Sequence, residues 1–185
     1  MNKSVTSRGD ILRESRLLVM REGLGAVSMR SVARACGIAV GSVYNYFPSK
    51  EELLREVTGE VWEDVFHVPG DAPDIGGFAE GMRWFAGRLA AGRERYPGFF
   101  SVHAMSLAAA GREAGRAKME AYVSRIRQCL LAILQRDGRV RADAFARGLS
   151  AEGLVGLVFD TLLSRAMRGQ EDPEPLISLV SQAIY

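Results

Sequence analysis

Apolar residues recur at helical spacing along most of this chain, and short Gly- and Pro-rich stretches separate the repeats. After Ser7, one face of a helix would carry Ile11, Leu12, Ser15, Leu18 and Val19, at i, i+1, i+4, i+7 and i+8. No run of alternating β-branched residues predicts a sheet. The pattern therefore predicts an all-α protein whose first helix begins after Ser7.

Two short helices follow, and a tight turn joins them. Ser28 is a predicted N-cap, and the helix after it places Met29, Val32, Ala33 and Cys36 on one face. Gly37 ends that helix at a position that often requires positive φ, and Pro48 ends a third helix over 40–47. This arrangement is typical of a helix-turn-helix, in which the second helix of the pair enters the major groove of DNA.

The stretch "VGSVYNYF", residues 40–47, divides its side chains between core and surface. Val43 and Phe47 lie at i and i+4, so they form one apolar stripe that faces inward. Tyr44, Asn45 and Tyr46 occupy adjacent positions, which cannot all face the core of one short helix. Exposed tyrosines beside an asparagine suit contacts with DNA phosphates and base edges.

The distribution of charge favours an anionic partner for the N-terminal segment alone. Residues 1–50 carry eight basic and three acidic side chains, whereas residues 51–67 carry one basic and six acidic ones. An ordinary solvated surface is the alternative. Ser49 is predicted to cap a fourth helix that runs to about residue 66, with Glu52 completing a capping box. Lys50 then lies beside free backbone N–H groups, a good position for a phosphate.

Residues 8–66, and above all "SMRSVARACGIAVGSVYNYFPSKEELL", resemble the N-terminal domain of TetR-type bacterial transcriptional regulators. The hydrophobic spacing, the Gly-Ile turn, the Tyr-x-Tyr-Phe ending and the Ser-Lys-Glu-Glu-Leu start match together. The resemblance implies a three-helix helix-turn-helix DNA-binding domain at 1–50, with a connecting helix at 49–67. It also implies a helical ligand-binding and dimerisation domain at 68–185.

The same resemblance implies the function. A homodimer would bind a palindromic operator in double-stranded DNA, repress transcription, and be released by a small-molecule effector. A ligand-independent regulator or an activator of the same fold is the alternative. The residues it assigns to DNA are Ser28, Arg30, Tyr44, Tyr46 and Lys50 for the phosphate backbone, and Val40, Gly41, Ser42 and Asn45 for base edges. The chain departs from the family at Ala39, where many members carry a hydroxyl residue.

Segment 68–77 is rich in Gly, Pro and Asp and marks the predicted domain boundary. Helices are expected beyond it near 74–95, 97–110, 113–137, 141–168 and 173–184. Aromatic and methionine residues there form either plain core or an effector pocket, whose candidates are Met82, Phe85, Phe99, Phe100, His103, Met119 and Tyr122. Such a lining suits an apolar or aromatic compound, and Arg93, Arg95 and Arg112 would admit an anionic one.

The last two predicted helices carry apolar faces that pack either within one chain or against a second copy. Small residues there would let another helix approach closely. The candidates for a dimer seam are Gly153, Gly156, Phe159, Leu163, Leu176, Leu179, Val180 and Ile184.

The remote alternative is a small helical enzyme that uses His103 or Cys129. Its two histidines stand outside any HExxH pattern, and the sequence has no GxSxG, P-loop or CxxC motif, so we expect no metal and no cofactor. A helical adaptor that binds only protein would not need a basic recognition helix. Because the sequence shows no signal peptide and no apolar run of about 20 residues, we expect a cytoplasmic, nucleoid-associated protein without membrane association.

Overall fold

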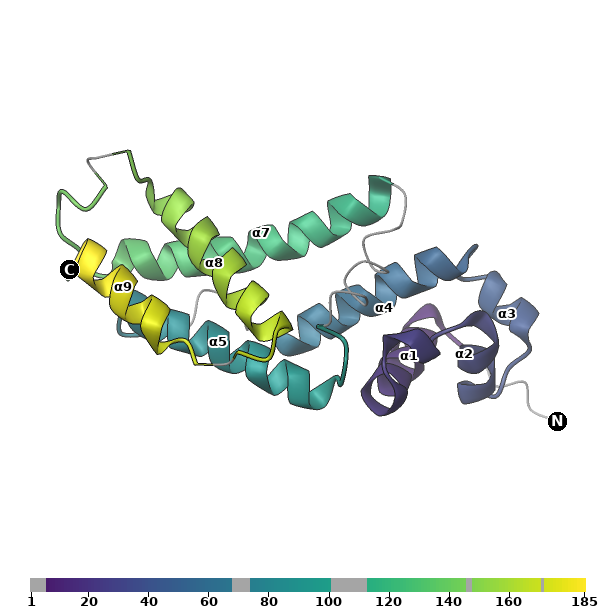
Figure 1. Cartoon of the computed structure of the whole chain (residues 1–185). Helices are drawn as coiled ribbons and strands as arrows, with labels where there is room; N and C mark the ends of the chain where they lie inside the picture. Colours follow the sequence, from purple (N-terminus) through teal and green to yellow (C-terminus); the bar gives the residue numbers. More distant parts are fainter. Residues whose placement is uncertain (1–5, 68–73, 101–112, 146–147, 171) are drawn as a thin grey trace. The chain divides into compact units, whose positions relative to one another are not determined.

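The computed structural model describes residues 6–67, 74–100, 113–145, 148–170 and 172–185, with the backbone alone at 113–119 (Figure 1). All regular secondary structure in these ranges is helical, as predicted. The chain forms two compact units. Unit 1 contains Met1–Val65 and Gly92–Tyr122, and unit 2 contains Phe66–Ala91 and Val123–Tyr185. The cut after Val65 lies close to the boundary expected at 68, but unit 1 also includes the later segment.

The helices follow one another with few other elements between them. Unit 1 begins with α1 (Arg8–Glu22), η1 (Leu24–Ala26), α2 (Met29–Ala35), α3 (Val40–Tyr44) and α4 (Lys50–Val65). Residues of α5 (Phe78–Arg95) and α7 (Glu113–Arg136) belong to both units, and α8 (Ala151–Met167) and α9 (Glu174–Ile184) belong to unit 2.

The first helix begins where its capping residues require. The Ser7 hydroxyl accepts from the Asp10 backbone N–H at 3.1 Å, and the Asp10 carboxylate accepts from the Ser7 N–H at 3.1 Å. The predicted face of α1 is buried. Gly23 ends the helix with φ of +82°, and a Cβ there would lie 3.4 Å from the Pro97 carbonyl oxygen. The turn after α5 therefore packs closely on the end of α1.

Two predicted helix boundaries differ from the structure. The third helix ends at Tyr44 and not at 47. Asn45 still has helical φ and ψ, and the Tyr46 and Phe47 amides both donate to the Val43 carbonyl at 3.0 Å in a final turn before Pro48. The prediction of helix over 141–150 is wrong. There Gly148 has φ of +86°, and Ser150 caps α8 by accepting from the Gly153 N–H at 2.9 Å. The helix predicted over 97–110 falls mostly outside the described residues.

Aromatic stacking fills the centre of unit 2. Phe85 on α5 lies between Phe66 and Phe159, with ring centroids 5.3 Å and 5.2 Å away. Gly81, one turn earlier, lets Ile133 on α7 come close, since an added Cβ would lie 3.1 Å from its methyl group. In Figure 1 the helices of this unit are the parts of α5 and α7 that belong to it, together with α8 and α9.

A buried carboxylate joins the ends of three helices in unit 2. Asp137, just after α7, accepts from the Phe78 N–H at 2.8 Å, which caps α5, and from the Tyr185 hydroxyl at 2.5 Å, just after α9. The Arg139 Nε donates to the same carboxylate at 2.9 Å. The Arg139 guanidinium above all, together with Tyr185 and the Phe78 amide, holds the pKa of Asp137 well below its usual range.

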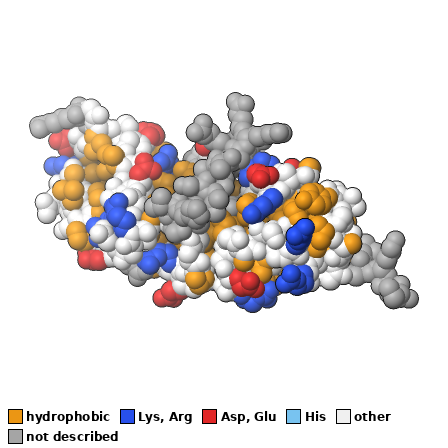
Figure 2. Space-filling view, turned by 45° about the vertical axis from the view of Figure 1, so that its right-hand side comes forward, with side chains coloured by type: hydrophobic (Ala, Val, Ile, Leu, Met, Phe, Trp, Pro, Cys, Tyr) orange, Lys and Arg blue, Asp and Glu red, His pale blue; other side chains and the backbone are white. Residues whose placement is uncertain are grey.

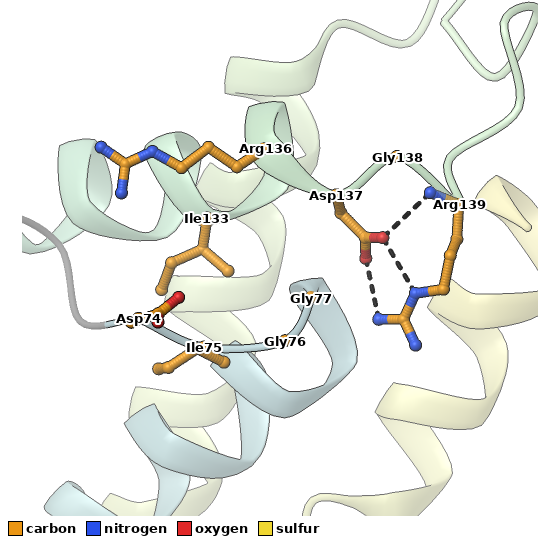
Figure 3. Close-up of a pocket in the computed structure, with 9 residues that line it drawn as sticks. All are labelled: Asp74, Ile75, Gly76, Gly77, Ile133, Arg136, Asp137, Gly138 and Arg139. Carbon is orange, nitrogen blue, oxygen red and sulfur yellow. Dashed lines mark hydrogen bonds and ion pairs between the residues drawn. The ribbon is translucent and has the colours of Figure 1, made fainter.

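A pocket of about 330 Å³ lies beside this carboxylate (Figure 3). Ile75 and Ile133 form its aliphatic walls, and Arg136 extends along one side. Figure 3 shows Asp137 turned toward Arg139, with its oxygens already bonded. The carboxylate therefore serves the fold of unit 2, and the pocket also presents the polar side chains of Asp74 and Arg136 beside its two isoleucines.

Candidate DNA-binding surface

The start of α2 is fixed by two serines. The Ser28 hydroxyl accepts from the Ser31 N–H at 3.1 Å, and the Ser31 hydroxyl donates to the Ala26 carbonyl at 2.7 Å. Ser28 is therefore half-buried and occupied in capping. Arg30 in the same turn is exposed and forms no ion pair with the described part of the chain. Of the two residues predicted here for phosphate contact, Arg30 is the freer one.

The turn between α2 and α3 depends on one glycine. Gly37 has φ of +65°, as predicted, a backbone conformation that residues with a Cβ rarely adopt. The Ile38 N–H then donates to the Ala33 carbonyl at 3.0 Å, so the chain is tied to α2 before α3 begins. This turn fixes the angle at which α3 leaves α2.

The side chains of α3 divide as predicted. Val43 and Phe47 are fully buried, which confirms the inward stripe. Tyr44 is 51% exposed and Val40 36%, and Gly41 and Asn45 are exposed as well, while Ser42 is half-buried. At the N-cap of α3, Ala39 provides no side-chain hydrogen bond. Figure 2 shows Lys and Arg side chains beside hydrophobic ones over the N-terminal helices, at the right-hand end of the view.

The start of α4 follows α3 closely in the sequence. Lys50 is its first residue and is exposed, without an ion pair to any described residue. The Ser49 hydroxyl accepts from the Glu52 N–H at 3.2 Å, which is the predicted cap. The Glu52 carboxylate lies 3.6 Å from Arg8 and 3.8 Å from Arg55. The cation at the start of α4 is thus free for an anion outside the protein.

Tyr46 and Arg8 differ from these free side chains, because both are bonded within the fold. The Tyr46 hydroxyl donates to the Thr6 carbonyl at 2.5 Å, and Arg8 Nη1 donates to the Tyr46 carbonyl at 2.7 Å. The Arg8 guanidinium also lies 4.4 Å above the ring of Phe47. Sequence reasoning missed this role of Arg8, although its position at the start of an amphipathic helix is evident.

A polar cluster ties α1 to α4 and to the turn after α5. Arg16 Nη1 donates to Asp64 at 2.9 Å and to the Tyr96 hydroxyl at 2.8 Å, and that hydroxyl donates to Asp64 at 2.8 Å. Arg95 adds an ion pair with Asp64 at 3.0 Å. Burial raises the pKa of the Tyr96 phenol, so it remains a hydrogen-bond donor at neutral pH. The helices that carry the candidate surface are therefore bonded to segment 95–100.

Comparison with known proteins assigns the N-terminal segment. Residues 11–57, from α1 into α4, match the model of the bacterial regulatory proteins of the tetR family. This segment is therefore of the TetR type. The chain is 29% identical over 154 residues to the HTH-type transcriptional repressor KstR of Mycolicibacterium smegmatis, a match that covers 82% of this chain and 74% of that protein.

Further relatives agree with this assignment. The KstR repressor of Rhodococcus jostii is 38% identical over 64 residues, which is 35% of this chain but only 30% of that protein. The fold is similar to that of RolR without ligand, with a TM-score of 0.66 and 17% identity over 96% of this chain and 90% of RolR. RolR in complex with resorcinol gives a TM-score of 0.54 and 19% identity over 89% and 79%. The named curated relatives are transcriptional repressors and not enzymes.

The chain distributes its predicted pocket residues over both units. Met82 and Phe85 are buried in unit 2, while Phe99 and Phe100 are buried and Tyr122 half-buried in unit 1. His103 and the side chain of Met119 lie outside the described residues.

A buried hydroxyl that sequence reasoning missed lies in the same part of unit 1. Thr58 on α4 is fully buried, and its Oγ1 has no hydrogen-bond partner among the described residues. It lies next to Gly59, where an added Cβ would be 3.0 Å from the Tyr122 ring, and one turn before Trp62, which packs edge-on against Phe100 with centroids 5.6 Å apart. No pattern in the sequence distinguishes this threonine from others.

The predicted dimer residues fall into two groups. Phe159, Val180 and Ile184 are buried within the protomer. Gly153 and Leu179 are exposed, and Gly156, Leu163 and Leu176 are half-buried. Leu157, which the sequence prediction did not include, is 63% exposed, and Leu179 is 65% exposed. The outward faces of α8 and α9 therefore carry bare leucines beside small residues.

Of the two residues named for the enzyme alternative, His103 lies outside the described residues and Cys129 lies within them. Burial raises the pKa of both the Cys36 and the Cys129 thiol, which is the opposite of what a nucleophilic thiolate needs. The described residues contain no group of His, Cys, Asp and Glu side chains suited to a metal ion. They also contain no helix with the length and apolar character for crossing a membrane.

Proposed function

We propose that this protein is a homodimeric repressor that binds a palindromic operator through α3 and is released by a small apolar or aromatic effector, acting on chromosomal DNA in the cytoplasm. The observation that carries the proposal is the division of α3, with Val43 and Phe47 buried and Tyr44 and Asn45 presented outward. Arg30 and Lys50 on the flanking helices are exposed cations that form no ion pair with a described residue.

In this proposal the exposed groups have separate roles. Arg30, Tyr44 and Lys50 contact phosphates, since a guanidinium, a phenol and an ammonium all donate to phosphate oxygens. Asn45, Val40, Gly41 and Ser42 meet base edges in the major groove. Ser28 contributes by capping α2, because its hydroxyl accepts from the Ser31 N–H and its own N–H donates to the Ser31 hydroxyl. Two copies of α3 in a dimer would read half-sites roughly 34–36 Å apart.

Dimerisation and effector binding rest on unit 2 and unit 1 respectively. Exposed leucines on α8 and α9 support a seam between two copies, because isolated soluble proteins rarely leave such side chains together in water. An unpartnered buried hydroxyl costs about 1–3 kcal/mol, so Thr58 supports an effector that supplies one hydrogen bond amid aromatic surface. Solved structures of RolR, which has this fold, include a complex with resorcinol.

Selection of bound duplexes from random-sequence DNA tests the proposal. We expect a pseudo-palindrome, with affinity that falls steeply as salt rises because phosphate contacts release counterions. Lys50→Ala should weaken binding to all sequences and lower the slope of log K against log salt by about 0.9. Asn45→Ala should instead relax the preference at particular base pairs while leaving that slope unchanged. Failure of the wild-type protein to enrich any duplex, or a flat salt dependence, would refute the proposed function.

A further inference from the structure

The recognition helix is too short to hold its own position. α3 has five residues, carries Gly41, and begins at Ala39 without a side-chain cap. Isolated helices of this length are unstable in water, so tertiary contacts at both ends must place it. Its start is tied to α2 through the Gly37 turn. What holds its other end, at residues 45–47, is therefore decisive for the geometry of the surface.

Two hydrogen bonds run in opposite directions at that end. Tyr46 donates its hydroxyl to the Thr6 carbonyl at 2.5 Å, and Arg8 donates Nη1 to the Tyr46 carbonyl at 2.7 Å. The two bonds join the residues before and at the start of α1 to the residue after α3. We name this arrangement the Arg8–Tyr46 clasp. It crosses from one end of the helix-turn-helix sequence to the other.

The clasp also uses the charge of Arg8 inside the protein. Arg8 Nη2 lies 3.6 Å from Glu52 and 3.7 Å from Glu56, both on α4, and the guanidinium covers the face of Phe47. Glu52 also lies 3.8 Å from Arg55, so Glu56 and a shared Glu52 carboxylate meet the charge of Arg8 within the protein. One side chain thereby joins α1, the end of α3 and α4.

The hydroxyl of Tyr46 is also used within the protein. A phenol has one O–H to donate, and in this structure it is given to Thr6. A phosphate oxygen only accepts, so it has no partner left at this hydroxyl. Tyr44, two residues earlier, is 51% exposed and makes no such bond with the described residues. The two tyrosines of the Tyr-x-Tyr-Phe motif therefore have different roles.

We propose that Arg8 and Tyr46 are positioning residues for the recognition helix, which raise operator affinity by fixing the end of α3 and contact no phosphate themselves. The inference rests on the proposed function as a DNA-binding protein. It assigns the outward chemistry of the motif to Tyr44 and Asn45 alone, and it assigns the first residue of α1 to the internal geometry of the surface.

The test compares Arg8→Met and Tyr46→Phe with Lys50→Met, on a duplex that the wild-type protein has selected, over a series of salt concentrations. Met keeps an unbranched apolar stem, and Phe keeps the ring. We expect both clasp variants to bind about 5- to 30-fold more weakly, as the loss of one or two such interactions implies. Their salt slope should equal that of wild type, whereas Lys50→Met should lower it by about 0.9.

Two further variants separate positioning from a general loss of stability. Arg8→Lys retains the charge but loses the planar fork, so it should bind almost as weakly as Arg8→Met. The double variant Arg8→Met, Tyr46→Phe should be little weaker than the single ones, because each single change already opens the clasp. Affinities are measured below the thermal unfolding of every variant, so that only folded protein is compared.

Each outcome is decisive. A salt slope lowered by about 0.9 in Arg8→Met would show a direct phosphate contact and overturn the inference, as would wild-type affinity in Tyr46→Phe. Multiplied losses in the double variant would also overturn it. If wild-type protein selects no duplex, the proposed function fails and the inference with it. Normal wild-type binding together with unchanged clasp variants removes the inference alone.

Discussion

Two surfaces of this protein expose large apolar side chains, and their surroundings differ. α3 exposes Tyr44, Val40 and Asn45. The helices before and after it carry the exposed cations Arg30 and Lys50, which pair with no residue in the described ranges. On α8, Leu157 follows Gly156, and on α9, Leu179 lies between Ser178 and Val180. The first surface mixes aromatic, hydrogen-bonding and cationic groups, and the second is aliphatic.

Both helices that carry the second surface contain a paired acidic side chain. Arg127 donates to Asp160 on α8 at 2.6 Å, and Arg83 donates to Glu174 on α9 at 2.7 Å. An aliphatic surface beside charges that are paired within the protomer suits contact with another protein, whereas exposed cations suit a polyanion. The exposure of an apolar side chain does not by itself indicate the class of partner. The charges around it help to distinguish a protein partner from a polyanion.

Placing charge on the aliphatic surface should have the largest effect of the changes considered, through the loss of dimerisation. We expect Leu157→Glu with Leu179→Glu to weaken dimerisation by at least about 100-fold, since four leucines per dimer would each lose about 1.5–3 kcal/mol of burial. Sedimentation equilibrium should then report a halved mass. Operator binding should fall as well, because a monomer presents one copy of α3.

Two further variants test whether the loss of the dimer is specific to the proposed seam on α8 and α9. Gln135→Glu adds a charge at an exposed position of α7 and should leave the mass unchanged. Gly156→Leu should also disrupt the dimer, because a Cβ at Gly156 meets no described atom within 4 Å and the rest of the side chain adds bulk at the proposed seam. An intact dimer in both Leu157→Glu with Leu179→Glu and Gly156→Leu would place the interface elsewhere.

The free energy of unfolding should depend on pH through the Asp137 carboxylate. The carboxylate of Asp137 bonds Tyr185, just after α9, and its pKa is held low by Arg139. A lowered folded-state pKa contributes stability that is complete above the unfolded pKa of about 3.9 and is lost as pH falls below it. We expect Asp137→Asn to lower the free energy of unfolding by about 2–3 kcal/mol at pH 7, measured by urea titration.

At pH 3 the difference between wild type and Asp137→Asn should be smaller than at pH 7, because wild type begins to lose the same interaction. Asp143→Asn is the matched control, since that carboxyl is exposed and has no bond to the described residues. Equal losses in both variants, or a difference that does not change with pH, would contradict the role of Asp137.

The burial of side chains was easier to predict on α3 than on α8, and the reason is physical. On α3 a single pair, Val43 and Phe47, can face inward, so the outward positions follow from helical geometry. On α8 the apolar residues occupy several faces, and periodicity alone does not indicate which of them is covered. Phe159 was therefore predicted at the seam although it is buried, and Leu157 was missed although it is exposed.

Contacts between distant segments were beyond prediction for a different reason. The Arg8–Tyr46 clasp and the bond from Arg16 to Tyr96 join residues far apart in the sequence, and neither position belongs to a local pattern. The same holds for Asp137, whose neighbours Arg139 and Gly138 look like an ordinary turn. Turns and caps such as Ser7, Gly37 and Ser49 were predicted because their chemistry is local.

The smallest expected effect concerns Thr58, which is buried in unit 1 and belongs to neither surface. Thr58→Val replaces a buried hydroxyl that has no partner among the described residues by a methyl group of the same shape. We expect an increase of about 1 kcal/mol in the free energy of unfolding, seen as a higher melting temperature without effector.

Val57→Thr is the reverse change at a fully buried neighbour on α4 and should lower stability by about 1–3 kcal/mol. Because both changes exchange the same two β-branched residues within one helix, their helix propensities nearly cancel. A lower melting temperature in Thr58→Val would show that the hydroxyl is already satisfied within the protein and would remove it as an effector contact.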